Sequence, residues 1–388
     1  MYYKDFLGNR VSALGLGLMR LPLKTGKNSS DALRDGDNGA IDKQAVEEMI
    51  AYAFEHGINY FDTAWPYHNG NSELVIGEVL KKYDRDSFYL ATKFPGFDLG
   101  NMPKVKEIFE RQLEKCQVEY FDYYLIHNVC ESNIDGYLNE EFGILDYMLE
   151  QKKAGKIKHF GFSAHGTLDT IKRFMESPFG EHMEFCQLQL NYMDWHFQQC
   201  DKKVEYCREK GLPVIVMEPV RGGKLANMSG EMLRELEKLR PEENSVSWAF
   251  RFTQSIDDIA IVLSGMSNMQ QLKENIATFD EPKALNEKEF ETLVSLKDKE
   301  IADIGIPCTA CNYCLTHCPQ GLPIPTLLRL YNEQVSSKGQ FSFISPMYLS
   351  TIPKEKHPDK CIACKSCEKV CPQRLFISDA LKEFTELL

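Results

Sequence analysis

The sequence predicts an α/β protein that consists of a closed barrel of strand–helix units and a mostly helical, cysteine-rich tail. From about residue 11 to residue 280, short apolar runs alternate with polar-rich stretches of helical length, as in parallel strands that are covered by helices. Beyond this part, eight of the 13 cysteines fall between Cys308 and Cys371. We therefore expect a barrel domain over residues 1–285, a linking helix over 286–304 and a tail domain over 305–388.

The apolar runs are dense in β-branched and aromatic residues, which favours strands buried on both faces. The predicted strands are residues 13–18, 58–64, 88–92, 121–126, 158–164, 186–190, 213–217 and 259–263. The predicted helices are residues 43–56, 72–83, 103–117, 137–154, 168–176, 199–210, 242–253 and 269–279. Eight such pairs in about 270 residues match the size of a (β/α)8 TIM barrel. An open doubly wound sheet is the alternative, although it rarely contains eight such even repeats.

Two further segments complete this part of the chain. Residues 24–41 are poor in apolar residues and rich in Gly, Asp and Asn, which predicts a loop inserted after the first strand. Loops that follow strands lie on the catalytic face of such a barrel, so this one either covers a site or is a surface insertion. An amphipathic helix over 287–301 then leads to the change of composition near Gly305.

The charge balance restricts the partners. The chain has 45 Lys and Arg against 57 Asp and Glu, a net charge of −12, and the tail from residue 302 is nearly neutral. Nucleic acid and anionic membranes are therefore unexpected partners. No apolar run reaches the length of a membrane span, and residues 1–5 do not resemble the start of a signal peptide, so we expect a cytoplasmic protein.

Two identical cysteine patterns in the tail predict metal. Each has the spacing C-x-x-C-x-x-C-x-x-x-C-P, from Cys308 to Pro319 and from Cys361 to Pro372. This spacing lets three thiolates bind one 4Fe-4S cluster while the fourth reaches the cluster of the other run. Zinc is the alternative, but zinc sites usually show two pairs of ligands. The expected ligand sets are Cys308, Cys311, Cys314 and Cys371 for one cluster, and Cys361, Cys364, Cys367 and Cys318 for the other.

This stretch resembles bacterial two-cluster ferredoxins, except that 42 residues separate the two runs. Residues 327–334 within that insert have a helical pattern, which resembles the helical ferredoxin modules of larger redox enzymes. A mostly helical, ferredoxin-like domain with two 4Fe-4S clusters is the expectation. The remaining cysteines have no ligand spacing, and we expect them to be buried or inert thiols; they are Cys116, Cys130, Cys186, Cys200 and Cys207.

Polar side chains stand at the ends of three successive predicted strands. Asp62 and Tyr67 follow the second strand, Lys93 ends the third and His127 ends the fourth. All these ends point to the same mouth of a barrel. An ammonium that lowers the pKa of a phenol, a carboxylate that holds the ammonium and an imidazole that orients a carbonyl form a general-acid site.

Across residues 5–285 the sequence resembles the aldo-keto reductase family. The matching segments are residues 11–17, 61–64, 72–73, 92–93, 125–127, 161–163 and 274–275. The resemblance implies a (β/α)8 barrel that reduces carbonyls with a nicotinamide cofactor and without metal. Carried over, Tyr67 donates the proton, Lys93 modulates its pKa, Asp62 is the partner of Lys93, and His127 orients the substrate.

The resemblance also implies a nucleotide site, with NADP(H) or NAD(H) as cofactor. Ser163 and Gln187 match carboxamide contacts, and Met217 takes the place of the Tyr that many members stack on the nicotinamide. Gly265 stands where the family often supplies a cation to the 2′-phosphate, and Arg221 or Lys224 is a candidate substitute. The expected nucleotide contacts are Gly17, Met19, Ser163, Gln187, Met217, Glu218, Pro219, Ser264, Gly265, Met266, Glu274 and Asn275.

The whole architecture, a barrel followed by two cluster motifs, resembles the ferredoxin-fused aldo-keto reductases, and this resemblance implies an iron–sulfur oxidoreductase that acts on a small carbonyl or alcohol. A hydride carries two electrons together and each cluster carries one, so a flavin in the barrel mouth or a separate electron-transfer protein is a further candidate. The alternative is a non-catalytic, redox-sensing barrel that binds NAD(P) and docks a partner.

Overall fold

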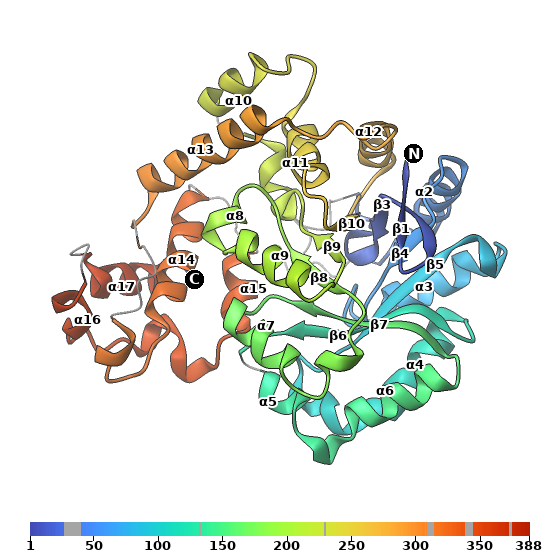
Figure 1. Ribbon diagram of the computed structural model, residues 1–388, viewed down its shortest axis with the longest axis horizontal. Coiled ribbons are helices and arrows are strands. Elements are labelled where there is room, and N and C mark those ends of the chain that lie inside the picture. Colours follow the sequence, from blue (N-terminus) through green and yellow to red (C-terminus); the bar gives the residue numbers. More distant parts are fainter. Residues whose placement is uncertain are drawn as a thin grey trace. The chain divides into compact units, whose positions relative to one another are not determined.

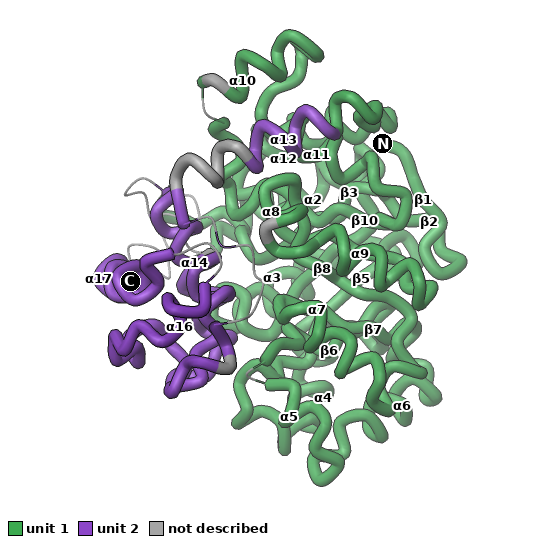
Figure 2. Tube along the Cα trace, turned by 60° about the vertical axis from the view of Figure 1, so that its left-hand side comes forward, with its two compact units in different colours: residues 1–290 green, residues 291–388 purple. Residues whose placement is uncertain are grey.

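The computed structural model divides the chain into two compact units, residues 1–290 and residues 291–388 (Figure 2). It describes residues 1–26, 40–131, 133–228, 230–306, 308, 314–337, 344–371 and 375–388. Most of the predicted insertion over 24–41 therefore lies outside the described residues. Among the described helices, none has the length and apolar character that a membrane crossing requires.

The first unit is a closed barrel of eight parallel strands (Figure 1), which confirms the predicted fold class. The sheet runs in the order β10-β3-β4-β5-β6-β7-β8-β9, so the first and last barrel strands pair and close it. The apolar runs form strands because nearly every residue in them is buried. The barrel strands are β3 (Leu14–Gly17), β4 (Tyr60–Asp62), β5 (Tyr89–Phe94), β6 (Phe121–Val129), β7 (Ile157–Ala164), β8 (Cys186–Gln189), β9 (Val214–Met217) and β10 (Ile259–Ser264).

A short hairpin that the sequence analysis did not predict precedes the barrel. β1 (Tyr3–Phe6) and β2 (Asn9–Ser12) pair antiparallel. Phe6 and Val11 of this hairpin belong to a buried apolar cluster with Tyr123 and Ile215 of the barrel strands. The four-residue strands are too short for a clear alternation, so only their packing against the barrel reveals them.

Helices surround the barrel (Figure 1), and most lie within two residues of their predicted bounds. The prediction of one helix over 137–154 was wrong: the chain forms two helices, and the second begins after Gly143, which has φ 58°. Two helices, α8 and α10, were not predicted. The helices of this unit are α2 (Lys43–Glu55), α3 (Asn71–Leu80), α4 (Val105–Cys116), α5 (Ile134–Tyr137), α6 (Ile144–Lys153), α7 (Leu168–Met175), α8 (Asp194–Phe197), α9 (Cys200–Glu209), α10 (Gly230–Glu237), α11 (Ser245–Gln254) and α12 (Met269–Thr278).

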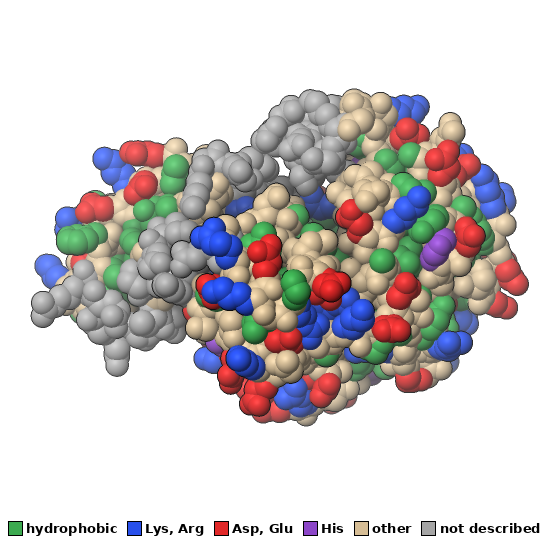
Figure 3. Space-filling view, turned by 90° about the horizontal axis from the view of Figure 1, so that it is seen from above, with side chains coloured by type: hydrophobic (Ala, Val, Ile, Leu, Met, Phe, Trp, Pro, Cys, Tyr) green, Lys and Arg blue, Asp and Glu red, His purple; other side chains and the backbone are tan. Residues whose placement is uncertain are grey.

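The helix α13 (Glu287–Ile304) spans the boundary between the units, and the described tail beyond it is helical. Its helices are α14 (Ile324–Ser336), α15 (Ile344–Ser350), α16 (Ser366–Lys369) and α17 (Ile377–Leu387). Apolar side chains of α14 and α17 form the core of the tail, and cysteines from both motifs pack in or against it. On the face shown in Figure 3, acidic and basic side chains are interspersed, as expected for a chain with many charges of both signs.

Candidate functional site

Three neighbouring strands bring the predicted polar side chains to the carboxyl end of the barrel. Asp62 ends β4, Lys93 lies on β5, and His127 lies near the end of β6. The Lys93 Nζ donates to Asp62 Oδ1 at 2.6 Å and to the carbonyl oxygen of Thr63 at 2.9 Å. Both charged side chains are nearly inaccessible, 1% exposed for Lys93 and 2% for Asp62. The predicted Lys–Asp pair is therefore formed, and it is buried.

Tyr67 reaches this pair from the loop that follows β4. The Lys93 Nζ lies 5.2 Å from the centre of the Tyr67 ring, and the ring meets His127 edge-on with centroids 6.3 Å apart. The loop is held locally, because Tyr67 N donates to Ala64 O and Ser72 N donates to Tyr67 O, each at 3.1 Å. The four predicted residues thus come together at one mouth.

Burial dominates the electrostatics of these groups. It raises the pKa of Tyr67, and the ammonium of Lys93 offsets only part of that rise, so the net shift is upward. Burial lowers the pKa of Lys93, but Asp62 and Tyr67 together raise it above its ordinary value, so the ammonium stays charged. Burial, followed by the charge of Lys93, holds the pKa of His127 well below its usual range. The site therefore combines a protonated phenol, an ammonium and a neutral imidazole at neutral pH.

His127 is positioned through its backbone. The pairing of β6 with β7 shifts register between Ile126 and Val129, and the Tyr137 hydroxyl donates to His127 O at 2.6 Å. His165, which directly follows β7, also lowers the pKa of His127 by its charge, while burial lowers its own pKa to about 3. The sequence analysis missed His165; its position immediately after a predicted strand was the available signal.

A second buried ion pair, between Lys115 and Glu73, is connected to the strand that carries Lys93. Glu73 Oε2 accepts from Lys115 Nζ at 2.6 Å, and its Oε1 accepts from Thr92 Oγ1 at 2.8 Å and from Gln112 Nε2 at 2.7 Å. The same Gln112 nitrogen donates to Lys93 O at 3.0 Å. This network ties α3 and α4 to the strand that carries Lys93, so it fixes the backbone from which the ammonium extends.

Several predicted carboxamide contacts lie on the next strands. Ser163 is the penultimate residue of β7, and its Oγ accepts from Asn128 N at 2.8 Å. Gln187 lies on β8, and its Nε2 donates weakly to Met217 Sδ on β9 at 3.6 Å. The Gln187 Oε1 is buried and has no hydrogen-bond partner in the described part of the chain. An acceptor in this state fits a ligand that donates an N–H, as a carboxamide does.

The remaining predicted nucleotide residues lie at strand ends, in the segments that follow them and on α12. Ser264 ends β10, and its Oγ accepts from Asn275 Nδ2 of α12 at 3.1 Å. A Cβ on Gly17 would lie 3.4 Å from Ser264 O, so the ends of β3 and β10 approach closely. Met266 is buried and Glu274 is exposed. Met19 follows β3, while Glu218, with φ 57°, and Pro219 follow β9.

Arg221, a candidate cation for the 2′-phosphate, forms a buried ion pair with Asp194. Its Nε and Nη2 each donate to the carboxylate of Asp194 at 2.9 Å, and both side chains are buried. The same carboxylate accepts from Gln189 and Asn191. This bidentate pair joins the loop after β9 to α8, so it gives Arg221 a structural role in addition to its candidacy as a substitute cation.

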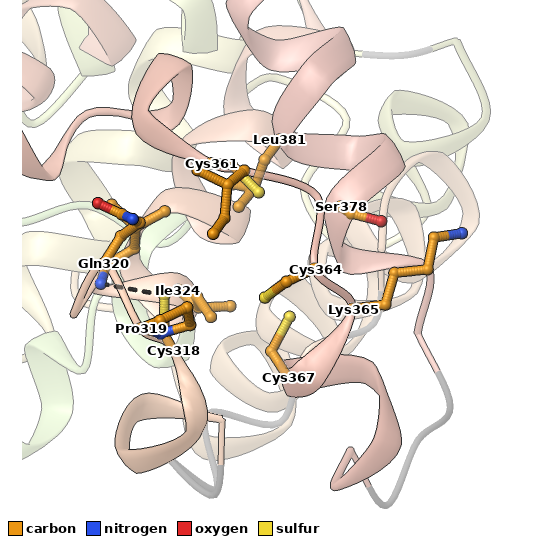
Figure 4. A pocket seen from close by; sticks show the side chains of 12 residues that line it. Cys318, Pro319, Gln320, Ile324, Cys361, Cys364, Lys365, Cys367, Ser378 and Leu381 are labelled. Atoms are coloured by element: carbon orange, nitrogen blue, oxygen red, sulfur yellow. Dashed lines mark hydrogen bonds between the residues drawn. The ribbon is translucent and has the colours of Figure 1, made fainter.

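In the tail, four predicted cysteine ligands surround one pocket. Cys318, Cys361, Cys364 and Cys367 line a partly open space of about 320 Å³, and their sulfur atoms point into it (Figure 4). Cys318 belongs to the first sequence motif and the other three to the second. The structure therefore brings together the crossed set that the spacing predicted.

The other set is only partly described. Cys308, Cys314 and Cys371 lie in or against the tail core, and Cys311 lies outside the described residues. The five cysteines without ligand spacing are buried in the barrel unit, as expected. Burial raises the pKa of two of them, Cys116 and Cys186, which makes these thiols poor nucleophiles.

Comparison with known proteins decides the family. Residues 13–298 match the aldo/keto reductase family and residues 307–376 match a 4Fe-4S dicluster domain. The chain belongs to the aldo/keto reductase family. It is an oxidoreductase whose barrel is joined to an iron–sulfur domain, as the resemblance implied.

Curated relatives support the family assignment, and solved structures support the fold. The chain is 31% identical over 224 residues to a probable aldo-keto reductase 1 of Glycine max, an alignment that covers 56% of this chain and only 58% of that protein. It is 25% identical over 286 residues to the NADH-specific methylglyoxal reductase of Escherichia coli, covering 63% of this chain and 85% of the relative.

Among solved structures, the fold is similar to the holo form of aldo-keto reductase AKR11C1 from Bacillus halodurans, with a TM-score of 0.61 and 23% identity over 76% of this chain and 96% of that one. An aldo-keto reductase from Klebsiella pneumoniae in complex with NADPH gives a TM-score of 0.58 at 18% identity, with the same coverage.

Proposed function

We propose that the barrel interconverts a small carbonyl and its alcohol with a nicotinamide dinucleotide, NADP(H) or NAD(H), and that the tail carries two 4Fe-4S clusters for electron transfer. The observation that carries the catalytic part is the buried Lys93–Asp62 pair beside Tyr67. An ammonium, a phenol and a neutral imidazole at one barrel mouth are the groups that carbonyl reduction needs.

In the direction of reduction, Tyr67 donates its proton to the carbonyl oxygen. A dihydronicotinamide held by Ser163 and Gln187 would supply a hydride to the carbonyl carbon, and the C=O π bond would break as one C–H and one O–H bond form. Lys93 stabilises the negative charge that remains on Tyr67, and Asp62 keeps Lys93 charged and in place. His127, uncharged because it is buried, is positioned to donate an N–H to the same oxygen and so to orient it.

The residues present fit a nicotinamide cofactor. Gln187 offers a buried carboxamide oxygen without a partner among the described residues, and Ser163 is held next to it by the pairing of β7 with β8. The thioether of Met217 offers an apolar surface against which the nicotinamide ring would pack. We assign the other predicted residues around the mouth, from Gly17 to Asn275, to the remainder of the nucleotide.

The cysteine pocket fits a 4Fe-4S cluster better than zinc. Structural zinc sites usually take their cysteines as two pairs. Here one cysteine of the first motif and three of the second line the same pocket. Three thiolates from one run and a fourth from the other are the ligand set of a 4Fe-4S cluster in two-cluster ferredoxins, where each thiolate binds a different iron. We assign the second cluster to Cys308, Cys311, Cys314 and Cys371.

The surface near the pocket suits an electron-transfer partner. Cys364 is exposed, and Ile362 and Phe376 nearby are 59% and 71% exposed. Lys360, Lys365 and Lys369 are exposed in the same segment. We propose that an acidic one-electron carrier docks here. A flavin, if one is bound, would accept two electrons together and pass them on one at a time. Complex formation that does not weaken with added salt would contradict an acidic partner.

The test of the catalytic assignment is Tyr67→Phe, with Tyr83→Phe as the matched control, because Tyr83 stacks on Phe54 away from the mouth. We expect Tyr67→Phe to lower kcat/KM for NAD(P)H-dependent aldehyde reduction by about 10²–10⁴-fold and the control to leave it unchanged. Equal activity of both variants removes Tyr67 from the mechanism. A wild-type chain that binds dinucleotide but reduces no aldehyde favours the redox-sensing alternative.

The cofactor assignment is tested on protein purified without oxygen. We expect iron and acid-labile sulfide near eight of each per chain, as two 4Fe-4S clusters require, together with a bound or bindable dinucleotide. A flavin content near zero removes the flavin, and stoichiometric zinc in place of iron contradicts the cluster assignment.

A further inference from the structure

The loop between β4 and α3 carries Tyr67, and a lysine of the next helix lies beside the loop on both sides of that residue. Lys115 is near the end of α4, and its Nζ lies 4.6 Å from the centre of the Trp65 ring, two residues before Tyr67. A Cβ on Gly70, three residues after Tyr67, would lie 3.5 Å from the same Nζ and 3.5 Å from Trp65 O. The ammonium therefore borders both arms of the turn that presents Tyr67.

Two helices hold this ammonium in place. Lys115 is only 7% exposed, and it donates to Oε2 of the fully buried Glu73 of α3 at 2.6 Å. A Cβ on Gly77 would lie 2.4 Å from Lys115 O, so the backbones of α3 and α4 approach closely. Because a buried charge that loses its partner is strongly destabilising, the ammonium stays where the two helices place it.

The same ion pair is connected to the second charged group of the site. The Gln112 Nε2 donates to Glu73 Oε1 at 2.7 Å and to Lys93 O at 3.0 Å. Lys115 itself lies over Trp65 in the loop that carries Tyr67. The contacts of one buried pair therefore lead both to the phenol and to the backbone of Lys93.

Proton transfer makes a strict demand on the position of Tyr67. Its hydroxyl must come within hydrogen-bond reach of the carbonyl oxygen, and a displacement of about 1 Å can lower a rate a hundredfold. A cation over an aromatic ring is attracted to it, by enough to change the population of a loop conformation about tenfold. The contact between Lys115 and Trp65 is therefore strong enough to select one position of the loop.

We propose that Lys115 is a positioning residue for proton transfer: its ammonium holds the Trp65 and Gly70 arms of the loop and so keeps Tyr67 beside Lys93. This inference rests on the proposed function of the barrel. Lys115 acts through Tyr67 and takes no part in the reaction itself. A buried Lys–Glu pair that only stabilises the fold is the alternative, and the two roles predict different kinetics.

The test compares Lys115→Met, Lys115→Arg and the control Lys106→Met, an exposed lysine on the same helix. The readouts are kcat and KM for reduction of butanal and of benzaldehyde, and the Kd of NADPH and NADH, in the full chain. We expect Lys115→Met to lower kcat roughly tenfold to a hundredfold and to leave both Kd values unchanged. Lys115→Arg, which keeps a cation for the ring, should recover part of kcat, and the control should match the wild type.

A double variant separates positioning from folding. Lys115→Met leaves Glu73 buried without its cation, which by itself could unfold the chain. Lys115→Met/Glu73→Gln removes that charge and keeps an acceptor for Thr92 and Gln112, and thermal melting verifies that it is folded. We expect kcat to stay low in this variant, because the ammonium over Trp65 is still missing. Recovery of the wild-type kcat would overturn the inference, since the loss would then come from the stranded carboxylate.

A double-mutant cycle shows whether Lys115 acts through Tyr67. In Tyr67→Phe the hydroxyl is already absent, so adding Lys115→Met should lower the residual activity little further. An equal fold loss in both backgrounds, or a wild-type kcat in a folded Lys115→Met, overturns the inference while the proposed function stands. A wild-type chain that reduces neither aldehyde with either dinucleotide overturns the proposed function, and the inference with it.

Discussion

The barrel and the tail use cysteine in opposite ways. In the barrel unit, all five cysteines are buried among apolar side chains, where an uncharged thiol packs like a small hydrophobic residue. In the tail, Cys367 belongs to a smaller core, Cys318 and Cys361 pack against it, and these three line a pocket together with the exposed Cys364. The same residue type is packing material in one region and a candidate ligand in the other, and the difference is that several tail cysteines share one pocket.

The two regions also differ in what holds them together. The barrel closes on itself through eight paired strands, so it needs no added group. The described tail is a set of short helices and turns, and a small domain of this kind usually needs a metal or a disulfide to be stable. We therefore expect the tail, and not the barrel, to depend on its clusters.

The largest expected effect comes from removing cluster ligands. In Cys361→Ser/Cys364→Ser we expect the iron content to fall by about half and the tail to become sensitive to limited proteolysis, while the barrel keeps its thermal transition. The control is Cys200→Ala in the barrel, which should leave the iron content unchanged. A protease-resistant tail in the iron-depleted variant would mean that the apolar core alone keeps the tail folded. The tail would then depend on its clusters no more than the barrel does.

The next effect concerns the charges buried in the barrel. Lys93→Met leaves Asp62 buried without its cation, so we expect a loss of about 3–5 kcal/mol in the free energy of unfolding. Adding Asp62→Asn removes the uncompensated charge and should recover much of that stability, but not the carbonyl reduction, which needs the ammonium. Denaturant titrations compare these variants with Lys158→Met, an exposed lysine over Tyr120. A double variant no more stable than Lys93→Met would contradict the charge explanation.

The smallest effect is the pH dependence that His68 contributes. Burial lowers its pKa from 6.5 to about 4, and its Nε2 accepts from Leu21 N at 3.0 Å, which requires the neutral ring. The unfolded chain binds the proton first, so this stability is complete above pH 6.5 and is lost as the pH falls toward 4. We expect the loss to be on the order of 2–3 kcal/mol.

His68→Gln tests this expectation, because it supplies an acceptor that does not titrate. The unfolding free energy of this variant should fall less steeply than that of the wild type between pH 6.5 and pH 4. Parallel pH profiles for the two proteins would place the acid sensitivity elsewhere, for example in His165.

Most of the fold was predictable because its signal is local. Each barrel strand is buried on both faces and so appears as a short apolar run, and the pairing of such runs with helical stretches identifies the barrel. The exceptions are segments whose local pattern is weak or misleading. Gly143 divides a helical pattern by adopting a positive φ, and Phe6 joins the core only because its hairpin packs against the barrel.

The candidate site, like the fold, was predictable only where its signal is local. The sequence by itself determined the barrel, the spacing of the cysteines and the presence of Asp62, Tyr67, Lys93 and His127 at strand ends, since these depend on neighbours along the chain. Only the tertiary structure decided that burial outweighs Lys93 in setting the pKa of Tyr67. It also decided the partner of Arg221, because Arg221 meets Asp194 across a distance in sequence that no local pattern records. Charge pairing and burial depend on which distant segments meet, and the closure of the barrel brings those segments together.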